Sequence, residues 1–161
     1  MDLAETRALT ADPSFEDFYR THFDRVYEIA FAFSGRREVA QDATQDAFSR
    51  AYTRWRRLGR ETWAAGWVMT TALNACRRQM RMARPPLPPS DSGEGPTPDR
   101  IALLAALRSL PDRQRQAIVL HYIGDLPVAA VAELMELTEG AVKSHLFKAR
   151  TALRSSLEVT E

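Results

Sequence analysis

The chain has 161 residues and a net charge of +1, from 22 Lys and Arg against 21 Asp and Glu, so overall charge alone does not indicate a nucleic-acid binder. A single cysteine, Cys76, excludes an internal disulfide and a thiolate metal cluster, and three scattered histidines have no metal-ligand spacing. We find no signal-peptide pattern and no apolar run of membrane-spanning length, and therefore expect a cytoplasmic protein without membrane association.

The first predicted helix begins after Ser14, a residue suited to cap it, and has Asp17 in its first turn. Aromatic and aliphatic residues then recur at helical spacing as far as Phe31, and Ser34-Gly35 ends the pattern. A second helix is predicted for residues 38–57.

After Gly59, a third long helix is predicted for residues 63–84. Nothing in this part of the chain alternates like a strand, so we expect residues 12–84 to form an all-helical domain.

Charge is distributed unevenly over this domain. Residues 1–49 hold five Arg and ten acids, whereas residues 50–84 hold nine Arg and one acid. Such neighbouring blocks suggest two different partners, although each block alone also fits a solvated face.

Residues 85–98 are rich in Pro, Gly, Ser and acids, which predicts a flexible linker between two small domains. The second domain, residues 99–157, is expected to contain four helices. The first two cover 99–109 and 112–122, are separated by Leu110-Pro111, and the second is predicted to start with Asp112 as its cap.

A helix-turn-helix is predicted at the end of this domain. A short amphipathic helix at 127–135 is followed by a tight turn at 136–138, and Thr138 is placed to cap the last helix, which ends near Leu157. The second helix of such a pair can enter the major groove of DNA.

The outer face of the last helix supplies the candidate DNA contacts. Gly140 permits close approach of backbone, Lys143 and Ser144 suit base edges, and Lys148 and Arg150 suit phosphates. Phe147 fits either a thymine methyl group or a place against a neighbouring helix. The candidate set is Glu139, Gly140, Lys143, Ser144, Phe147, Lys148 and Arg150.

The third helix and the loop before it combine tryptophans with arginines, a combination suited to stacking bases and holding the backbone of single-stranded nucleic acid. We expect Trp67 to lie in the core, whereas Trp63 fits either the core or a stacking role. The candidate set is Trp63, Asn74, Arg77, Arg78 and Arg81.

The second helix carries a polar face formed by Asp42, Gln45 and Asp46 beside Phe48. This patch fits a solvated surface or a docking surface for a basic partner. We find no catalytic triad, phosphate-binding glycine loop or cluster of metal carboxylates, and expect neither enzymatic activity nor a cofactor.

Together, these motifs resemble RNA polymerase sigma factors of the extracytoplasmic-function (ECF) group of the sigma-70 family, from about Phe15 to Leu157. The matching segments are Gln41 to Phe48 with Trp55, Trp67 to Asn74, Leu110-Pro111, Gln114 to Tyr122, Gly124-Asp125, and Gly140 to Ser144. Two positions depart from the pattern, where Leu73 and His145 replace a common Arg.

The resemblance implies a promoter-specificity subunit without catalytic activity. In this family the first domain, sigma region 2, docks on the β′ clamp of core RNA polymerase and opens and reads the −10 element, with Asn74 and Trp63 near a flipped base. The second domain, region 4, contacts the β flap and reads the −35 element. The family also has anti-sigma factors as partners, of which the sequence carries no signature.

The main alternative is a stand-alone helix-turn-helix regulator with a helical N-terminal sensor or dimerisation module. A sensor predicts a pocket or a self-complementary apolar face along residues 39–55, whereas a sigma factor predicts a polar docking face there. A small helical enzyme, the third alternative, lacks candidate residues.

Overall fold

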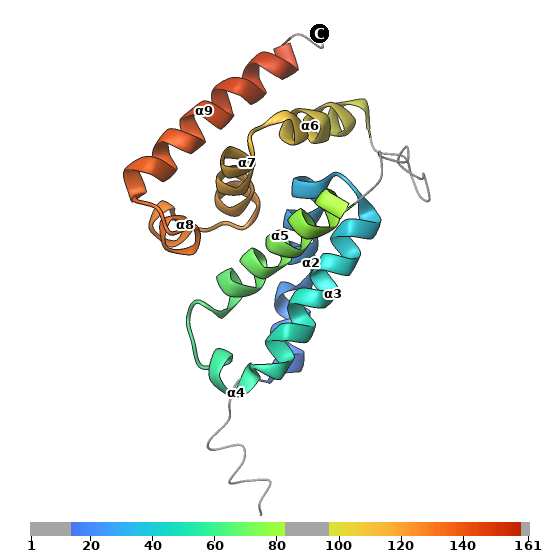
Figure 1. Ribbon diagram of the computed structural model, residues 1–161, viewed down its shortest axis with the longest axis vertical. Coiled ribbons are helices and arrows are strands. Elements are labelled where there is room, and N and C mark those ends of the chain that lie inside the picture. Colours follow the sequence, from blue (N-terminus) through green and yellow to red (C-terminus); the bar gives the residue numbers. More distant parts are fainter. Residues whose placement is uncertain (1–13, 83–96, 159–161) are drawn as a thin grey trace, which may run out of the picture.

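The computed structural model describes residues 14–82 and 97–158, and every regular element in these two ranges is a helix (Figure 1). The N-terminal module contains α2 (Phe15–Ser34), α3 (Arg37–Thr53), α4 (Trp55–Leu58) and α5 (Ala64–Met82). The C-terminal module contains α6 (Pro98–Ser109), α7 (Asp112–Ile118), the π-helix η1 (Val119–Ile123), α8 (Val128–Met135) and α9 (Glu139–Glu158). The all-α prediction is therefore confirmed.

Several helix ends form where the sequence predicts them. The Ser14 hydroxyl accepts the backbone N–H of Asp17 at 3.5 Å, and the Thr138 hydroxyl accepts that of Ala141 at 3.1 Å. Gly35 closes α2 with a left-handed φ of 70°, a conformation that costs little only for glycine. These ends follow from local hydrogen bonding, which is why the sequence reveals them.

The structure describes only the end of the segment that we predicted to be a linker, residues 85–98. Residues 83–96 lie outside the described residues. Pro98, which we had assigned to the linker, instead begins α6, and the Thr97 hydroxyl caps that helix by accepting the N–H of Arg100 at 3.3 Å.

The second predicted helix is interrupted near its end. Arg54 leaves helical geometry at φ −109° and ψ 11°, which separates α3 from the single turn of α4. The Arg54 guanidinium lies over the Trp67 ring of α5, 5.8 Å from its centre, and the turn that follows buries Leu58. The break at Arg54 thus turns the chain, and the Arg54 side chain contacts α5.

The helix predicted for residues 112–122 widens into η1 in its last turn, where the N–H of Gly124 bonds to the carbonyl of Val119 at 2.9 Å. Asp112 does not cap it, as we had predicted. Pro111 precedes the helix without a side-chain cap, and the Asp112 carboxylate is directed to Arg77 of α5 instead.

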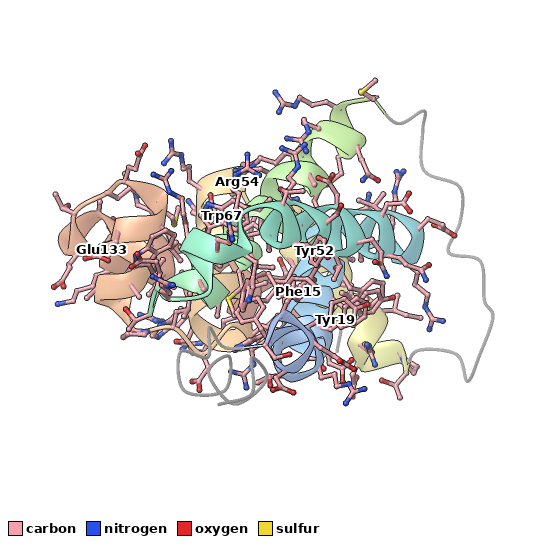
Figure 2. All side chains as sticks on the ribbon, turned by 90° about the horizontal axis from the view of Figure 1, so that it is seen from below. Phe15, Tyr19, Tyr52, Arg54, Trp67 and Glu133 are labelled. Atoms are coloured by element: carbon pink, nitrogen blue, oxygen red, sulfur yellow. The ribbon has the colours of Figure 1, made fainter. Side chains whose placement is uncertain are left out.

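Aromatic rings fill the space between α2 and α3. Phe48 lies 4.9 Å from Tyr19, and Phe15 lies 5.1 Å from Tyr52 (ring centres in both cases). Figure 2 shows Phe15 beside Tyr52 and Arg54 beside Trp67. Edge-to-face contacts of this kind add to the burial of apolar area and fix the angle between the two helices.

The two modules pack against each other and share one apolar core. Figure 1 shows the C-terminal module seated on one end of the N-terminal helices, where α2 contacts α6 and η1, and α5 contacts α8. At Gly66 of α5, an added Cβ would lie 3.0 Å from the Leu134 methyl group of α8. The glycine therefore allows the close approach of α5 and α8.

Candidate polymerase and nucleic-acid interfaces

The polar face of α3 is available to a partner. Asp42 and Gln45 are exposed, and Asp46 is partly exposed. One oxygen of the Asp46 carboxylate lies 3.0 Å from Nε of Arg50 and 3.4 Å from a guanidinium nitrogen of Arg78 in α5. Such exposed pairs exchange readily for other partners, since each is worth at most about 1 kcal/mol.

Phe48 does not belong to this face, contrary to our prediction. Its side chain is only 2% exposed and packs among the rings of Phe18, Tyr19 and Phe23. It therefore supports α3 from the core side and cannot reach a docking partner while the module is folded. Phe48 follows Gln45 by three residues, so helical spacing makes the two neighbours on the helix surface. Only the packing shows that the Phe48 ring is directed to the core rather than to the polar face.

The two tryptophans near α5 have different environments. Trp63, in the turn before the helix, is 50% exposed, so the first of its two alternatives, a place in the core, is excluded and the stacking role stays a prediction. Trp67 is half-buried against the core and covered on one side by Arg54. An exposed indole can serve as a stacking platform for an unpaired base.

The polar residues of α5 lie on its outer side, but one of them is already engaged. Nε of Arg77 lies 2.9 Å from both carboxylate oxygens of Asp112, and the guanidinium also donates to the side-chain oxygens of Gln116 and Asn74. Arg78 and Arg81 remain exposed. Leu73, which departs from the family pattern, is fully buried and presents nothing to DNA.

The outer face of α9 is open. Gly140, Lys143, Ser144 and Lys148 are exposed, as is Glu139 in the first turn. Phe147 is 65% exposed, so it does not lie against a neighbouring helix. The opposite face of α9 is buried through Val142, Leu146 and Ala149. The helix thus presents a polar face containing one aromatic ring, as expected of a recognition helix.

Arg150 lies at the edge of the face and is exposed. Its guanidinium donates to the Tyr122 hydroxyl of η1 at 2.9 Å, and both residues line an apolar groove of about 350 Å³ between α6, η1 and α9. We had grouped Arg150 with the phosphate contacts because of its charge, and that role stays a prediction.

The groove was not predicted from the sequence. Its walls are aliphatic side chains of α6, α7, η1 and α9 with two arginines at the edge: Leu103, Leu107, Ile118, Val119, Ile123, Leu153, Arg150 and Arg154. Leu103 and Tyr122 are exposed there. The sequence signal that could have revealed the groove is the set of apolar residues on α6, of which Leu103 is exposed.

Within residues 14–82 and 97–158, no three His, Cys, Asp or Glu side chains gather as metal ligands, and no helix is both long and apolar enough to cross a bilayer. Cys76 is fully buried, and its burial raises the pKa of the thiol to about 12, which suits a core position rather than a reactive one.

The fold and these surfaces define a class of protein: an all-helical, two-module DNA-binding protein whose second module ends in a helix-turn-helix. Residues 18–85 match the family model described as Sigma-70 region 2, and residues 100–153 match that of Sigma-70, region 4.

Curated relatives narrow the class. The ECF RNA polymerase sigma factor SigE of Mycolicibacterium smegmatis is 33% identical over 91% of this chain, which spans 63% of that relative's length. SigM of Mycobacterium tuberculosis, also an ECF sigma factor, is 30% identical over 87% of this chain and 75% of its own length. The chain therefore belongs to the ECF sigma factors of the sigma-70 family, which are transcription initiation factors rather than enzymes.

Solved structures share the fold. The sigma factor RpoE of Bartonella quintana, solved with the anti-sigma factor NepR, matches with a TM-score of 0.76 at 20% identity, over 91% of this chain and 98% of that one. CnrH, solved with the cytosolic domain of CnrY, matches with a TM-score of 0.72 at 20% identity, over 91% and 89% of the two chains.

Proposed function

We propose that this chain is a promoter-specificity subunit that binds core RNA polymerase, acts in the cytoplasm and directs initiation at promoters with matching −10 and −35 elements. The observation that carries the proposal is the open face of α9, a recognition helix capped by Thr138 within a region 4 match. Region 2 supplies the second DNA contact and the main docking surface for polymerase.

In this proposal, residues 99–157 read duplex DNA at −35. Lys143 and Ser144 meet base edges, Lys148 holds a phosphate, and the exposed Phe147 ring meets a thymine methyl group. Region 2, residues 12–84, opens and reads the −10 element through Trp63, Asn74 and the arginines of α5.

Polymerase docking is assigned to Asp42, Gln45 and Asp46, whose acidic and polar face complements a basic surface on the β′ clamp. The double variant Asp42→Arg with Asp46→Arg is expected to weaken binding to core polymerase by at least about tenfold, since it sets like charges against each other. Binding is measured by fluorescence anisotropy, together with run-off transcription from a library of randomised promoters.

The matched control is Asp24→Arg with Glu28→Arg, two exposed acids with the same four-residue spacing on α2. It introduces the same charge change on another face and should leave polymerase binding unchanged. Equal binding by both double variants would refute the docking assignment. Duplex DNA binding without any polymerase complex would instead identify a stand-alone regulator.

The apolar groove of region 4 is the proposed site for the β flap of polymerase. Leu103→Glu, on the wall of the groove, is expected to reduce −35-dependent transcription several-fold, because burial of a charge in an apolar contact is costly. Ile101→Glu is the control, since Ile101 is exposed on the same helix but does not line the groove. Equal loss in both variants would exclude the groove as the contact.

An anti-sigma factor is a further proposed partner. RpoE was solved with the anti-sigma factor NepR, and CnrH was solved with the cytosolic domain of CnrY. Co-purification of this chain with a regulatory protein that blocks polymerase binding would support the assignment.

A further inference from the structure

A second pocket, separate from the apolar groove of region 4, lies where α2, α5 and α7 meet. Its volume is about 350 Å³, which is at the lower end of the range of small-molecule sites. Three arginines, one acid and two apolar side chains line it: Arg77, Arg81, Arg115, Asp112, Phe33 and Met80. We name it the arginine pocket.

The lining of the arginine pocket carries an excess of positive charge. Three guanidiniums stand against one carboxylate, which leaves a formal charge of +2. Burial lowers the pKa of the Arg115 guanidinium, the Asp112 carboxylate raises it, and the charges of Arg108 and Arg77 lower it again. Like charges gathered in a partly buried place repel one another, so an anion that enters the pocket is favoured.

Arg115 is anchored but retains a donor without an acceptor. Its guanidinium donates to the carbonyl of Phe33 at 3.0 Å and to those of Arg108 and Leu110 at 3.1 and 3.2 Å. The Phe33 ring centre lies 4.8 Å from its guanidinium carbon. Its Nε is buried and has no hydrogen-bond partner among the described residues. Buried donors are nearly always paired, so an orphan in the lining of a pocket indicates a place for an acceptor.

The α5 side of the pocket combines one fixed and one available arginine. Nε of Arg77 lies 2.9 Å from both carboxylate oxygens of Asp112, and the Arg77 side chain is only 20% exposed. Arg81, one helical turn further on, is exposed. Among the described residues, its guanidinium makes only a long hydrogen bond, 3.4 Å from Nε to the Arg77 carbonyl. Its remaining N–H groups are therefore available to a ligand.

We propose that the arginine pocket binds the diphosphate group of a small molecule, either free diphosphate or a nucleoside diphosphate. A diphosphate carries more than one negative charge, which matches the formal +2 of the lining. Its two sets of oxygens can accept from guanidiniums on opposite walls, whereas a single phosphate or sulfate reaches fewer of them. The site is a property of the free chain, so it does not depend on the proposed function.

The test is titration calorimetry of the full chain at a constant ionic strength of about 0.15 M without divalent cations, so that general screening is equal for every anion. Pyrophosphate and GDP should each bind at least about tenfold more tightly than inorganic phosphate or sulfate. Equal affinity for sulfate and pyrophosphate would reduce the site to general attraction of anions and overturn the proposal. Tighter binding of GDP than of pyrophosphate would identify a nucleoside diphosphate as the ligand, and equal binding would identify free diphosphate.

Two arginines of the same helix give a matched pair of variants. Arg81→Ala removes a charge-assisted contact and should weaken pyrophosphate binding by about tenfold. Arg78 is exposed on α5 but does not line the pocket, so Arg78→Ala should change the affinity by less than about twofold. Because Arg81 is exposed, its loss leaves the core of the chain intact. Equal losses in the two variants would overturn the pocket as the binding site.

An acid in the lining predicts a change of opposite sign. Asp112→Asn removes the one negative charge of the lining and should strengthen pyrophosphate binding by about threefold. Glu133→Gln removes an exposed carboxylate of α8 outside the pocket and should leave the affinity unchanged (Figure 2). Weaker binding by Asp112→Asn would contradict the placement of the anion beside this carboxylate.

The pocket also has a regulatory consequence, which rests on the proposed function. Arg81 is a candidate −10 contact, so a bound diphosphate and −10 DNA compete for it. Pyrophosphate at ten times its own Kd should weaken binding of a single-stranded −10 oligonucleotide several-fold, up to about tenfold for complete exclusion. Pyrophosphate binding without competition would overturn this regulation but not the site. Absence of oligonucleotide binding, with pyrophosphate binding intact, would count against the proposed function alone.

Discussion

Helices α5 and α9 are nearly equal in length, at 19 and 20 residues, and each is assigned to one promoter element, yet their outer faces are in different states. On α9, Lys143, Ser144 and Phe147 point to open surroundings. On α5, Arg77 is held by α7 of the other module. Position explains the difference, because the main contacts of α9 are with α6, α7 and α8 of its own module, whereas α5 also contacts α8 of the other module.

The comparison shows that two helices of similar composition can differ in how far their outer faces are open to nucleic acid. Both helices combine a buried apolar stripe with a polar outer face. The closed arrangement leaves the proposed −35 face open and part of the proposed −10 face covered. Three predictions about these helices, beginning with the largest expected effect, test how far this contrast extends.

Substitutions of two adjacent residues of α9 should differ sharply in their effect on the free energy of unfolding. Leu146→Ala, in the core, is expected to lower the free energy of unfolding by about 2–5 kcal/mol. Phe147→Ala, 65% exposed, should change it by less than about 0.5 kcal/mol. Urea denaturation followed by circular dichroism measures both. A large loss for Phe147→Ala would show that its ring is packed in solution and would remove the contrast with α5.

The base-reading role of α9 is tested by Lys143→Ala with Ser144→Ala. Loss of two base contacts should reduce the preference for a matching −35 element by about 10–100-fold while sparing polymerase binding. Competitive transcription on promoters that differ only at −35 gives the ratio. Unchanged promoter choice would contradict the assignment of α9.

Within α5, Arg78 should contribute directly to −10 DNA binding, since it is exposed and pairs only weakly with Asp46 of its own module. Arg78→Ala should weaken −10 DNA binding in the polymerase complex by about 1 kcal/mol, or roughly fivefold, and should lower by about one the slope of the logarithm of the binding constant against the logarithm of the salt concentration. Arg20→Ala, which removes an exposed arginine of α2, serves as the control. Equal losses in the two variants would contradict a direct contact of Arg78 with DNA.

Much of the fold was predictable because it depends on neighbours along the chain. Apolar spacing, the Ser14 and Thr138 caps and the Gly35 break predicted the helices and the helix-turn-helix, and the structure confirms them. The same spacing predicted the exposed face of α9 at Lys143 and Ser144. These features follow from rules that act over three or four residues.

The incorrect predictions concern side chains whose partners lie far away in sequence or on another element. Phe48 was assigned to a polar face but packs with rings of α2. Asp112 was assigned to a helix cap but pairs with Arg77, 35 residues before it.

The sequence by itself determined that this protein is helical, has two modules and contains a helix-turn-helix in the second one, because local spacing and capping encode these properties. Only the tertiary structure decided that the modules share a core and that Arg77 is occupied by Asp112 and Gln116. The physical reason is that a charged side chain has the same sequence signature whether it faces water, nucleic acid or another module, and its partner is chosen when the surfaces meet.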